Sequence, residues 1–147
     1  MAGSGFGGCR LGVVPRPPLP PELDAFLAKP NSAVIGTVRP DGSPVTVATW
    51  YDWEDGRVLV NMDNSRRRLA HMRADPRVSL TVLSLANWGS HVSLRGRVTS
   101  FVDDVDLRDI DRLARRYGLD AYPLREDART SAWIEVEHWH AWHPENL

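Results

Sequence analysis

Residues 60–80 read VNMDNSRRRLAHMRADPRVSL, and they carry the clearest structural pattern in the chain. An apolar strand over residues 57–62 leads through a polar turn into a short basic helix over residues 66–73. A second strand begins at Arg77, directly after Asp75-Pro76, and alternates apolar with polar residues. Such alternation is typical of a strand that buries one face, so the stretch predicts two strands joined by a small helix.

Strands also dominate on both sides of this stretch. The turn signal Pro40-Asp41-Gly42-Ser43 separates two runs that are rich in β-branched and aromatic residues. Gly96 interrupts a later strand and is a candidate β-bulge. Six strands with short turns indicate a mainly β, antiparallel barrel. The expected strands cover residues 33–39, 45–53, 57–62, 77–85, 91–101 and 132–142.

One long helix and two short ones accompany these strands. The long helix is expected over residues 103–117, with Asp103 as its cap and Gly118 at its end. The short helices are expected over residues 22–28 and 66–73. Residues 1–21 are rich in Gly and Pro and are expected to form a disordered tail, so residues 22–147 make the single domain.

Composition excludes several broad classes of function. A formal net charge of −1 gives no reason to expect a nucleic-acid partner. No apolar run has the length of a membrane span, and no signal peptide is visible, so we expect no membrane association. Cys9 is the single cysteine, which fits a cytoplasmic protein.

Three consecutive arginines break the usual charge pattern of a helix. Arg66, Arg67 and Arg68 fall in the first turn of the short basic helix, which Ser65 or Asn64 would cap. The start of a helix carries partial positive charge, so three cations are unfavourable there. An anion would make the arrangement favourable, because N–H groups, a serine hydroxyl and arginine forks all suit a phosphate. Ordinary surface charge on a poorly formed turn is an equally good interpretation of these residues alone.

Aromatic and histidine residues give weaker signals. Trp88 lies among polar residues in a loop and is expected to pack on something, either a core or dimer contact or a planar cofactor. His138 and His140 share one face of the last strand, but no clear third ligand accompanies them, and we expect no metal site. Neither a Gly-rich phosphate loop nor a nucleophile elbow is visible.

Three motifs in this order resemble the pyridoxamine 5′-phosphate oxidase-like FMN-binding split-barrel superfamily. They are VIGTVRPDGSPVTVATW at residues 34–50, the stretch at residues 60–80, and ANW at residues 86–88 followed by VSLRGRV at residues 92–98. The resemblance is greatest to the small actinobacterial coenzyme F420-dependent oxidoreductases. It implies a six-stranded antiparallel split β-barrel of Greek-key type.

The resemblance also implies a cofactor site and a partner. Arg66 and Arg68, beside Ser65, match the positions that hold the cofactor phosphate, although a lysine is usual in place of Arg68. Asn87 and Trp88 match a loop that reaches the cofactor from the second subunit, so the resemblance implies a homodimer with a site at each interface. Strand residues expected beside the cofactor are Thr46, Val47, Ala48, Asn61 and Met62.

The function implied is hydride transfer between coenzyme F420 and a small organic substrate. In such enzymes the cofactor carries the difficult chemistry, which agrees with the lack of an evident catalytic base. Two alternatives stay open: an FMN-dependent oxidoreductase of the same superfamily, and a non-catalytic protein that binds a flavin or a haem. Coenzyme F420 adds negative charges beyond the phosphate, for which Arg39, Arg57, Arg67 and Arg73 are the nearby candidates.

Overall fold

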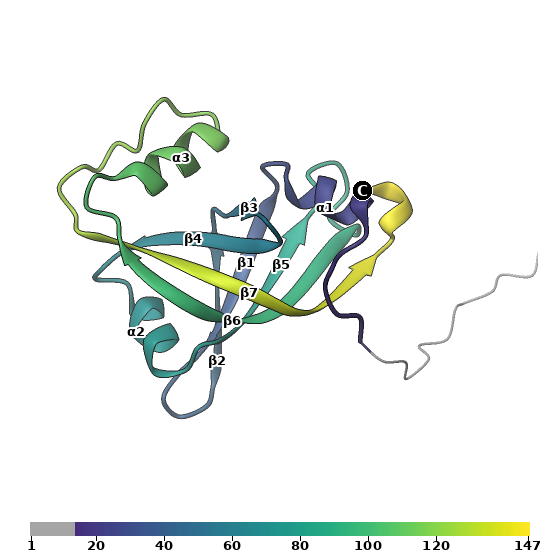
Figure 1. Ribbon diagram of the computed structural model, residues 1–147, viewed down its shortest axis with the longest axis horizontal. Coiled ribbons are helices and arrows are strands. Elements are labelled where there is room, and N and C mark those ends of the chain that lie inside the picture. Colours follow the sequence, from purple (N-terminus) through teal and green to yellow (C-terminus); the bar gives the residue numbers. More distant parts are fainter. Residues whose placement is uncertain (1–13) are drawn as a thin grey trace, which may run out of the picture.

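The computed structural model describes residues 14–147 as one antiparallel sheet rolled into a split barrel (Figure 1). Its strands run in the order β2-β1-β5-β6-β7-β4-β3, and each neighbouring pair is antiparallel. The strands are β1 (Ser32–Val38), β2 (Pro44–Thr49), β3 (Asp52–Glu54), β4 (Arg57–Asp63), β5 (Arg77–Leu83), β6 (His91–Asp103) and β7 (Arg129–Trp142). In the described chain β2 and β3 are the two edges of this sheet, and the split lies between them.

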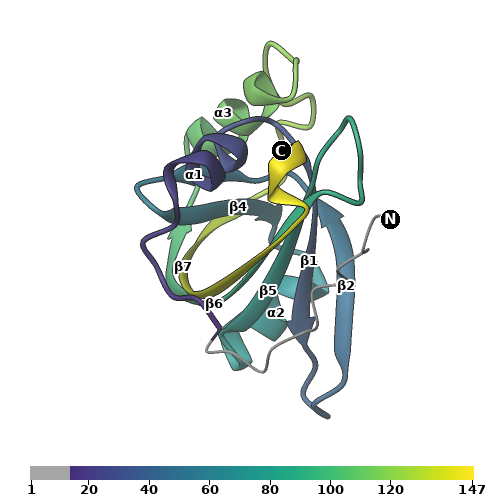
Figure 2. The same cartoon turned by 90° about the vertical axis from the view of Figure 1, so that its right-hand side faces the viewer.

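Three helices and a final short turn complete the molecule. They are α1 (Pro21–Leu27), α2 (Arg67–Ala74), α3 (Arg108–Arg116) and the 3₁₀ turn η1 (Pro144–Asn146). Helices α2 and α3 lie toward one end of the barrel and α1 toward the other (Figure 1). Viewed from the α1 side, the strands curve around a common interior (Figure 2).

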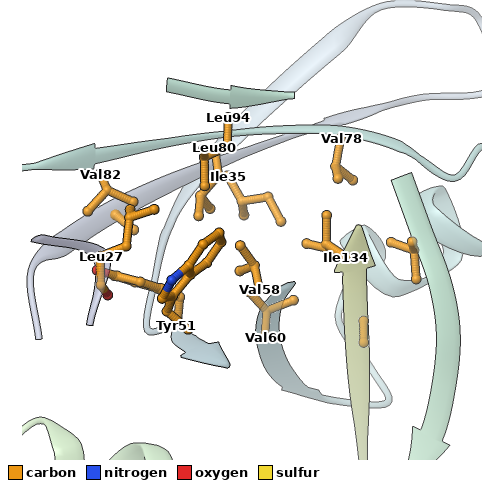
Figure 3. Close-up of a cluster of buried hydrophobic side chains, with 14 of the residues drawn as sticks. Leu27, Ile35, Tyr51, Val58, Val60, Val78, Leu80, Val82, Leu94 and Ile134 are labelled. Atoms are coloured by element: carbon orange, nitrogen blue, oxygen red, sulfur yellow. The ribbon is translucent and has the colours of Figure 1, made fainter. Parts of the chain in front are cut away.

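Alternation along the strands fills that interior with apolar side chains. Strand β5 buries Val78, Leu80 and Val82 and leaves the residues between them more exposed, as the sequence predicted. These side chains meet others from β1, β4, β6 and β7 inside the barrel (Figure 3). Helix α1 closes the interior with Leu23, Phe26 and Leu27, all three buried.

Two local predictions about turns and bulges are confirmed. Gly42 has a φ of 84°, and the Asp41 carboxylate accepts a hydrogen bond from the backbone N–H of Ser43, which closes the turn between β1 and β2. The pairing of β6 with β7 shifts register between Arg95 and Gly96. A Cβ on Gly96 would lie only 1.9 Å from the backbone oxygen of Glu135, so only glycine fits at this bulge.

The expected strand over residues 45–53 is two strands, which makes seven in place of six. It breaks at Trp50 and Tyr51, between β2 and β3. The Trp50 ring stacks on Tyr117, and the backbone N–H of Tyr51 donates to the Tyr117 hydroxyl at 3.4 Å. These contacts with Tyr117, which directly follows α3 (Arg108–Arg116), replace the strand pairing that would continue β2.

The long helix begins five residues later than predicted, at Arg108. Strand β6 continues through Asp103, which pairs with Thr130 of β7. Asp103 is therefore not the cap. Leu107, with a φ of 57°, occupies the N-cap position, and the capping carboxylate comes from Asp104, which accepts hydrogen bonds from the backbone N–H groups of Asp109 and Ile110 at 3.1 and 3.0 Å. Gly118, with a φ of 88°, follows the end of the helix as expected.

The expected disordered tail falls largely outside the described residues, which begin at Val14. Residues 14–20 have neither helix nor strand structure, but they contact the barrel. The backbone oxygens of Pro15 and Arg16 accept hydrogen bonds from the backbone N–H and the indole N–H of Trp139. Cys9 lies outside the described residues. No helix within residues 14–147 combines the length and the apolar character needed to cross a membrane.

Candidate functional site

A cavity of about 860 Å³ lies in the split of the barrel. The edge strand β2 forms one wall and β4 another, while α2 and α3 contribute residues from the two sides. Its lining includes the arginines near the start of α2, here called the cationic end, and the aromatic rings of Trp50, Tyr117 and Tyr122 beside α3, here called the aromatic end. The split therefore provides one continuous site with a cationic end and an aromatic end.

Arg68 is the most unusual side chain at the cationic end. Its Nε is fully buried and has no hydrogen-bond partner among the described residues. One terminal nitrogen, Nη2, donates to the backbone oxygen of Asn61 at 3.3 Å. Burial, together with the positive charges of Arg66 and Arg129, lowers the pKa of the Arg68 guanidinium. Asp63 offsets part of this effect, but no carboxylate within residues 14–147 forms a salt bridge with Arg68, so the cavity wall presents a cation without a direct partner.

Arg129 is a second such cation, placed at the first residue of β7. Its side chain lines the cavity although the residue is only 6% exposed. Its Nε donates to Oδ1 of Asn61 at 2.7 Å, and its guanidinium lies 4.5 Å from the centre of the Tyr122 ring. Within the described chain, neither terminal nitrogen of Arg129 has a hydrogen bond or a carboxylate partner.

Asn61 positions both of these arginines. Its backbone oxygen accepts a hydrogen bond from Arg68, and its side-chain oxygen accepts one from Arg129. Its side-chain N–H groups donate to Asp104 at 3.0 Å and to Ser131 at 3.1 Å. Asn61 is only 5% exposed. Asn61 also lines the cavity, and its hydrogen bonds orient the two cations.

The predicted cofactor residues on β2 and β4 come together around the cavity. Thr46, Val47 and Ala48 line it from β2, and Met62 lines it beside Asn61 from β4. Because β2 is an edge strand, part of its backbone has no neighbouring strand to pair with in the described sheet. A planar ligand lying along β2 would find both apolar side chains and free backbone groups.

The predicted cap of α2 is wrong, and Ser65 and Arg66 both contact Asp63. Arg66, and neither Ser65 nor Asn64, occupies the capping position of α2, and no side chain caps this helix within residues 14–147. The Ser65 hydroxyl instead donates to the carboxylate of Asp63, and Ser65 is not among the cavity-lining residues of the described chain. Arg66 lines the cavity, but its Nε also donates to Asp63 at 2.7 Å.

Asn87 and Trp88 do not line the cavity of their own chain, as far as the described residues show. Trp88 is 78% exposed, in the loop between β5 and β6. Four arginines were expected near the negative charges that coenzyme F420 carries beyond its phosphate. Of these, Arg39 and Arg67 line the cavity. Arg57 and Arg73 do not; they lie over the rings of Trp133 and Phe101.

The sequence did not reveal several cavity residues. Arg129 and Tyr122 lie beyond the long helix, and no local pattern connects them to the arginines of α2. Thr37 and His71 also line the cavity, with the Thr37 hydroxyl 3.4 Å from Nδ1 of His71. Thr37 follows the inward alternation of β1, and that period-2 pattern could have placed it on the inner face.

The fold and the cavity together define a split-barrel protein with an arginine-lined cavity in the split. Comparison with protein families agrees: residues 19–143 match the family described as pyridoxamine 5′-phosphate oxidase. The chain belongs to this family, as its motifs indicated. No curated protein matches the chain.

Solved structures show the same fold. An F420 reductase is 24% identical with a TM-score of 0.75, over 80% of this chain and 94% of that one. The conserved hypothetical protein Rv2991 from Mycobacterium tuberculosis is 20% identical with a TM-score of 0.67, over 90% of both chains. General Stress Protein 26 from Bacillus anthracis str. Sterne is 17% identical with a TM-score of 0.65, over 84% of this chain and 92% of that one.

Proposed function

We propose that the protein is an oxidoreductase that transfers a hydride between coenzyme F420, a deazaflavin, and a small organic substrate. The observation that carries the proposal is Arg68, a cation with a buried, unpartnered Nε on the wall of a large cavity. A buried charge without a partner is costly, and functional sites are where such costs are found. An anionic ligand would give the Arg68 guanidinium a partner and offset this cost.

The cavity residues fit a ligand with a phosphate and a planar ring system. Arg68 and Arg66 would bind the phosphate, together with the N–H groups at the start of α2, which have no acceptors inside the helix. The edge strand β2 would orient the ring through Thr46, Val47 and Ala48. When bound, a reduced deazaflavin supplies the hydride. The protein residues hold and orient the reactants and limit the access of water.

The choice between coenzyme F420 and FMN rests on two further observations. An F420 reductase is among the structural neighbours, which favours the deazaflavin. Arg39 and Arg67 also line the cavity, and they provide cations for the negative charges that F420 carries beyond its phosphate. The family description favours FMN as the alternative cofactor.

We also propose that two copies of the chain form the complete site. Trp88, on the loop matched to the one that reaches a neighbouring subunit's cofactor, is largely exposed, and so is Leu85. Trp142 near the end of β7 is 53% exposed. Exposed aromatic side chains of this size are typical of an interface. The Asn87-Trp88 loop of one chain would then close the cavity of the other chain.

A competition experiment tests the proposed cofactor. Coenzyme F420 and FMN are titrated separately and against each other at moderate salt, and reduction of the bound cofactor is followed by absorbance. We expect F420 to bind at least about tenfold more tightly, a difference of about 1.4 kcal/mol. Tighter binding of FMN, with turnover on FMN alone, would replace the deazaflavin by the flavin. Binding of either cofactor weaker than about millimolar would contradict the enzyme proposal.

A further inference from the structure

Three aromatic rings lie together on the cavity wall and form its aromatic end. Trp50 lies between β2 and β3, Tyr117 directly follows α3, and Tyr122 lies in the loop before β7. The Trp50 and Tyr117 rings stack at 5.2 Å with an interplanar angle of 7°, and Tyr122 meets Trp50 edge-on at 6.1 Å. All three line the cavity and are half-buried, so they keep surface available to a ligand.

Hydrogen bonds fix the two tyrosine residues of this group. The Tyr117 hydroxyl donates to the backbone oxygen of Asn31 at 2.8 Å. The backbone N–H of Tyr122 donates to the Asp111 carboxylate at 2.9 Å, and Arg125 pairs with the same oxygen at 2.5 Å. A site whose side chains are fixed before binding loses less conformational entropy when a ligand arrives. The aromatic end is therefore organised as a binding surface.

Arg129 joins this aromatic surface to a positive charge. It lies over the Tyr122 ring at 4.5 Å and is held at Nε by Asn61. Its terminal nitrogens, which have no partner in the described chain, are the donors that form a fork for a carboxylate. Arg68 contacts the backbone of Asn61, whereas Arg129 contacts its side chain; the two cations lie near each other but are held by different groups of Asn61.

We infer that this aromatic end is a substrate subsite for a flat aromatic or conjugated ring that carries a carboxylate. Trp50, Tyr117 and Tyr122 would contact the ring through stacked or edge-to-face arrangements, which planar rings prefer. Arg129 would bind the carboxylate. The inference rests on the proposed function, because it assigns Arg68 to the cofactor and leaves Arg129 for the substrate.

Binding of 2-naphthoate to the full-length protein tests this inference. Calorimetric titration is done without cofactor and again in the presence of saturating F420. Two matched probes serve as controls: 2-naphthamide, which is flat but neutral, and decahydro-2-naphthoate, which is charged but not flat. We expect 2-naphthoate to bind about tenfold more tightly than either, because each control lacks one of the two interactions.

Variants separate the subsite from the cofactor site. Trp50→Leu and Arg129→Gln should each weaken 2-naphthoate binding about tenfold and leave the affinity for F420 within about threefold. Arg129→Lys should restore part of the affinity, since it restores the charge but not the fork. Arg57→Gln is the control, because Arg57 lies over Trp133 and is not a cavity residue in the described chain.

The outcomes distinguish the inference from the proposed function. Equal binding of 2-naphthamide and 2-naphthoate would overturn the role of Arg129. Displacement of 2-naphthoate by F420, or a Trp50→Leu variant that loses F420 binding to the same extent, would overturn the subsite by assigning the aromatic end to the cofactor. Tight binding of 2-naphthoate without any binding of F420 would support the subsite and contradict the proposed function.

Discussion

Arg68 is a charged side chain that its own protein does not satisfy. Its buried Nε lacks a partner among the described residues, and Arg66 and Arg129 add repulsion. In most buried ion pairs a neighbouring carboxylate offsets the cost of desolvation, and removal of one partner is destabilising. Here no carboxylate of the described chain pairs with Arg68, so the residue is expected to serve binding at the expense of stability.

The cost of burying the Arg68 charge predicts how the stability changes when that charge is removed. In cofactor-free protein, Arg68→Gln should leave the free energy of unfolding unchanged or raise it by about 1 kcal/mol, because the change removes a desolvated cation. Chemical denaturation measures this. Arg77→Gln, at an exposed arginine paired with Asp75, is the control and should change stability by less than about 1 kcal/mol. A loss of several kcal/mol in Arg68→Gln would mean that the residue is structural.

At the scale of the elements, most strands were predictable, whereas the break between β2 and β3 and the start of α3 were not. Alternating burial specifies β5, and the turn residues specify the hairpin of β1 and β2. The start of α3 depends on a contact between distant segments: the Asp104 carboxylate, which caps the helix, also accepts a hydrogen bond from Asn61 of β4. No local pattern shows which of two neighbouring aspartates has such a partner.

The same limit applies to the candidate site. The arginines of α2 are adjacent in sequence, so their unfavourable charge pattern is visible there. Arg129 is brought beside Asn61 only by the pairing of β4 with β7, in which Asn61 opposes Ser131. Long-range pairing of this kind leaves no local trace in the sequence.

Matched substitutions at the two aspartates test the observed start of α3. Asp104→Ala should lower the free energy of unfolding by about 1–2 kcal/mol, because it removes the cap of the helix. Asp103→Ala should change it by less than about 0.5 kcal/mol, since Asp103 is exposed. Denaturation curves of both variants give the comparison. The reverse order of effects would restore Asp103 as the cap.

Tyr51 connects α1 to the junction of β2 and β3, and it predicts a pH dependence. Its buried hydroxyl donates a hydrogen bond shared by the backbone oxygens of Leu27 and Lys29, at 2.8 and 2.9 Å. Burial raises the pKa of Tyr51 to about 12, from its ordinary value of 10.0. Between these two pH values the unfolded chain releases a proton that the folded chain retains, so stability falls as pH rises.

A Tyr51→Phe variant isolates this contribution. At pH 7 the variant should be less stable than the wild type by about 1 kcal/mol, the usual net value of a hydrogen bond. The advantage of the wild type should then decrease between about pH 10 and pH 12, because phenylalanine has no proton to release. Unfolding measured at several alkaline pH values checks this. A difference that stays constant up to pH 12 would contradict the raised pKa.

At the scale of the whole molecule, residues 14–147 leave two tryptophans largely uncovered. Of the tryptophans on β7, Trp133 is covered by Arg57 and Trp139 is held by the backbone of residues 15 and 16, whereas Trp142 is exposed. Trp88 is exposed to a greater extent. A pair of chains that buries Trp88 and the end of β7 would remove this surface from water.

Sedimentation tests this assembly. The wild type should sediment as a dimer at micromolar concentration, and Trp88→Ser should weaken the dimer by about tenfold or more, as is usual for a buried tryptophan at an interface. Trp133→Phe, at a ring that Arg57 already covers, is the control and should remain dimeric. A wild-type monomer at micromolar concentration would contradict the proposed interface.

Whether Arg68 binds the cofactor is decided by the affinity for coenzyme F420 of the wild type and of Arg68→Gln, titrated side by side at the same salt concentration. A charge-assisted hydrogen bond to phosphate is worth about 1.5–3 kcal/mol, so the variant should bind F420 about ten- to a hundredfold more weakly while remaining folded. Arg66→Gln should lose less, because Arg66 already pairs with Asp63. Equal affinity of the wild type and Arg68→Gln would show that the unpartnered cation does not bind the cofactor, and would contradict the assignment of the cavity.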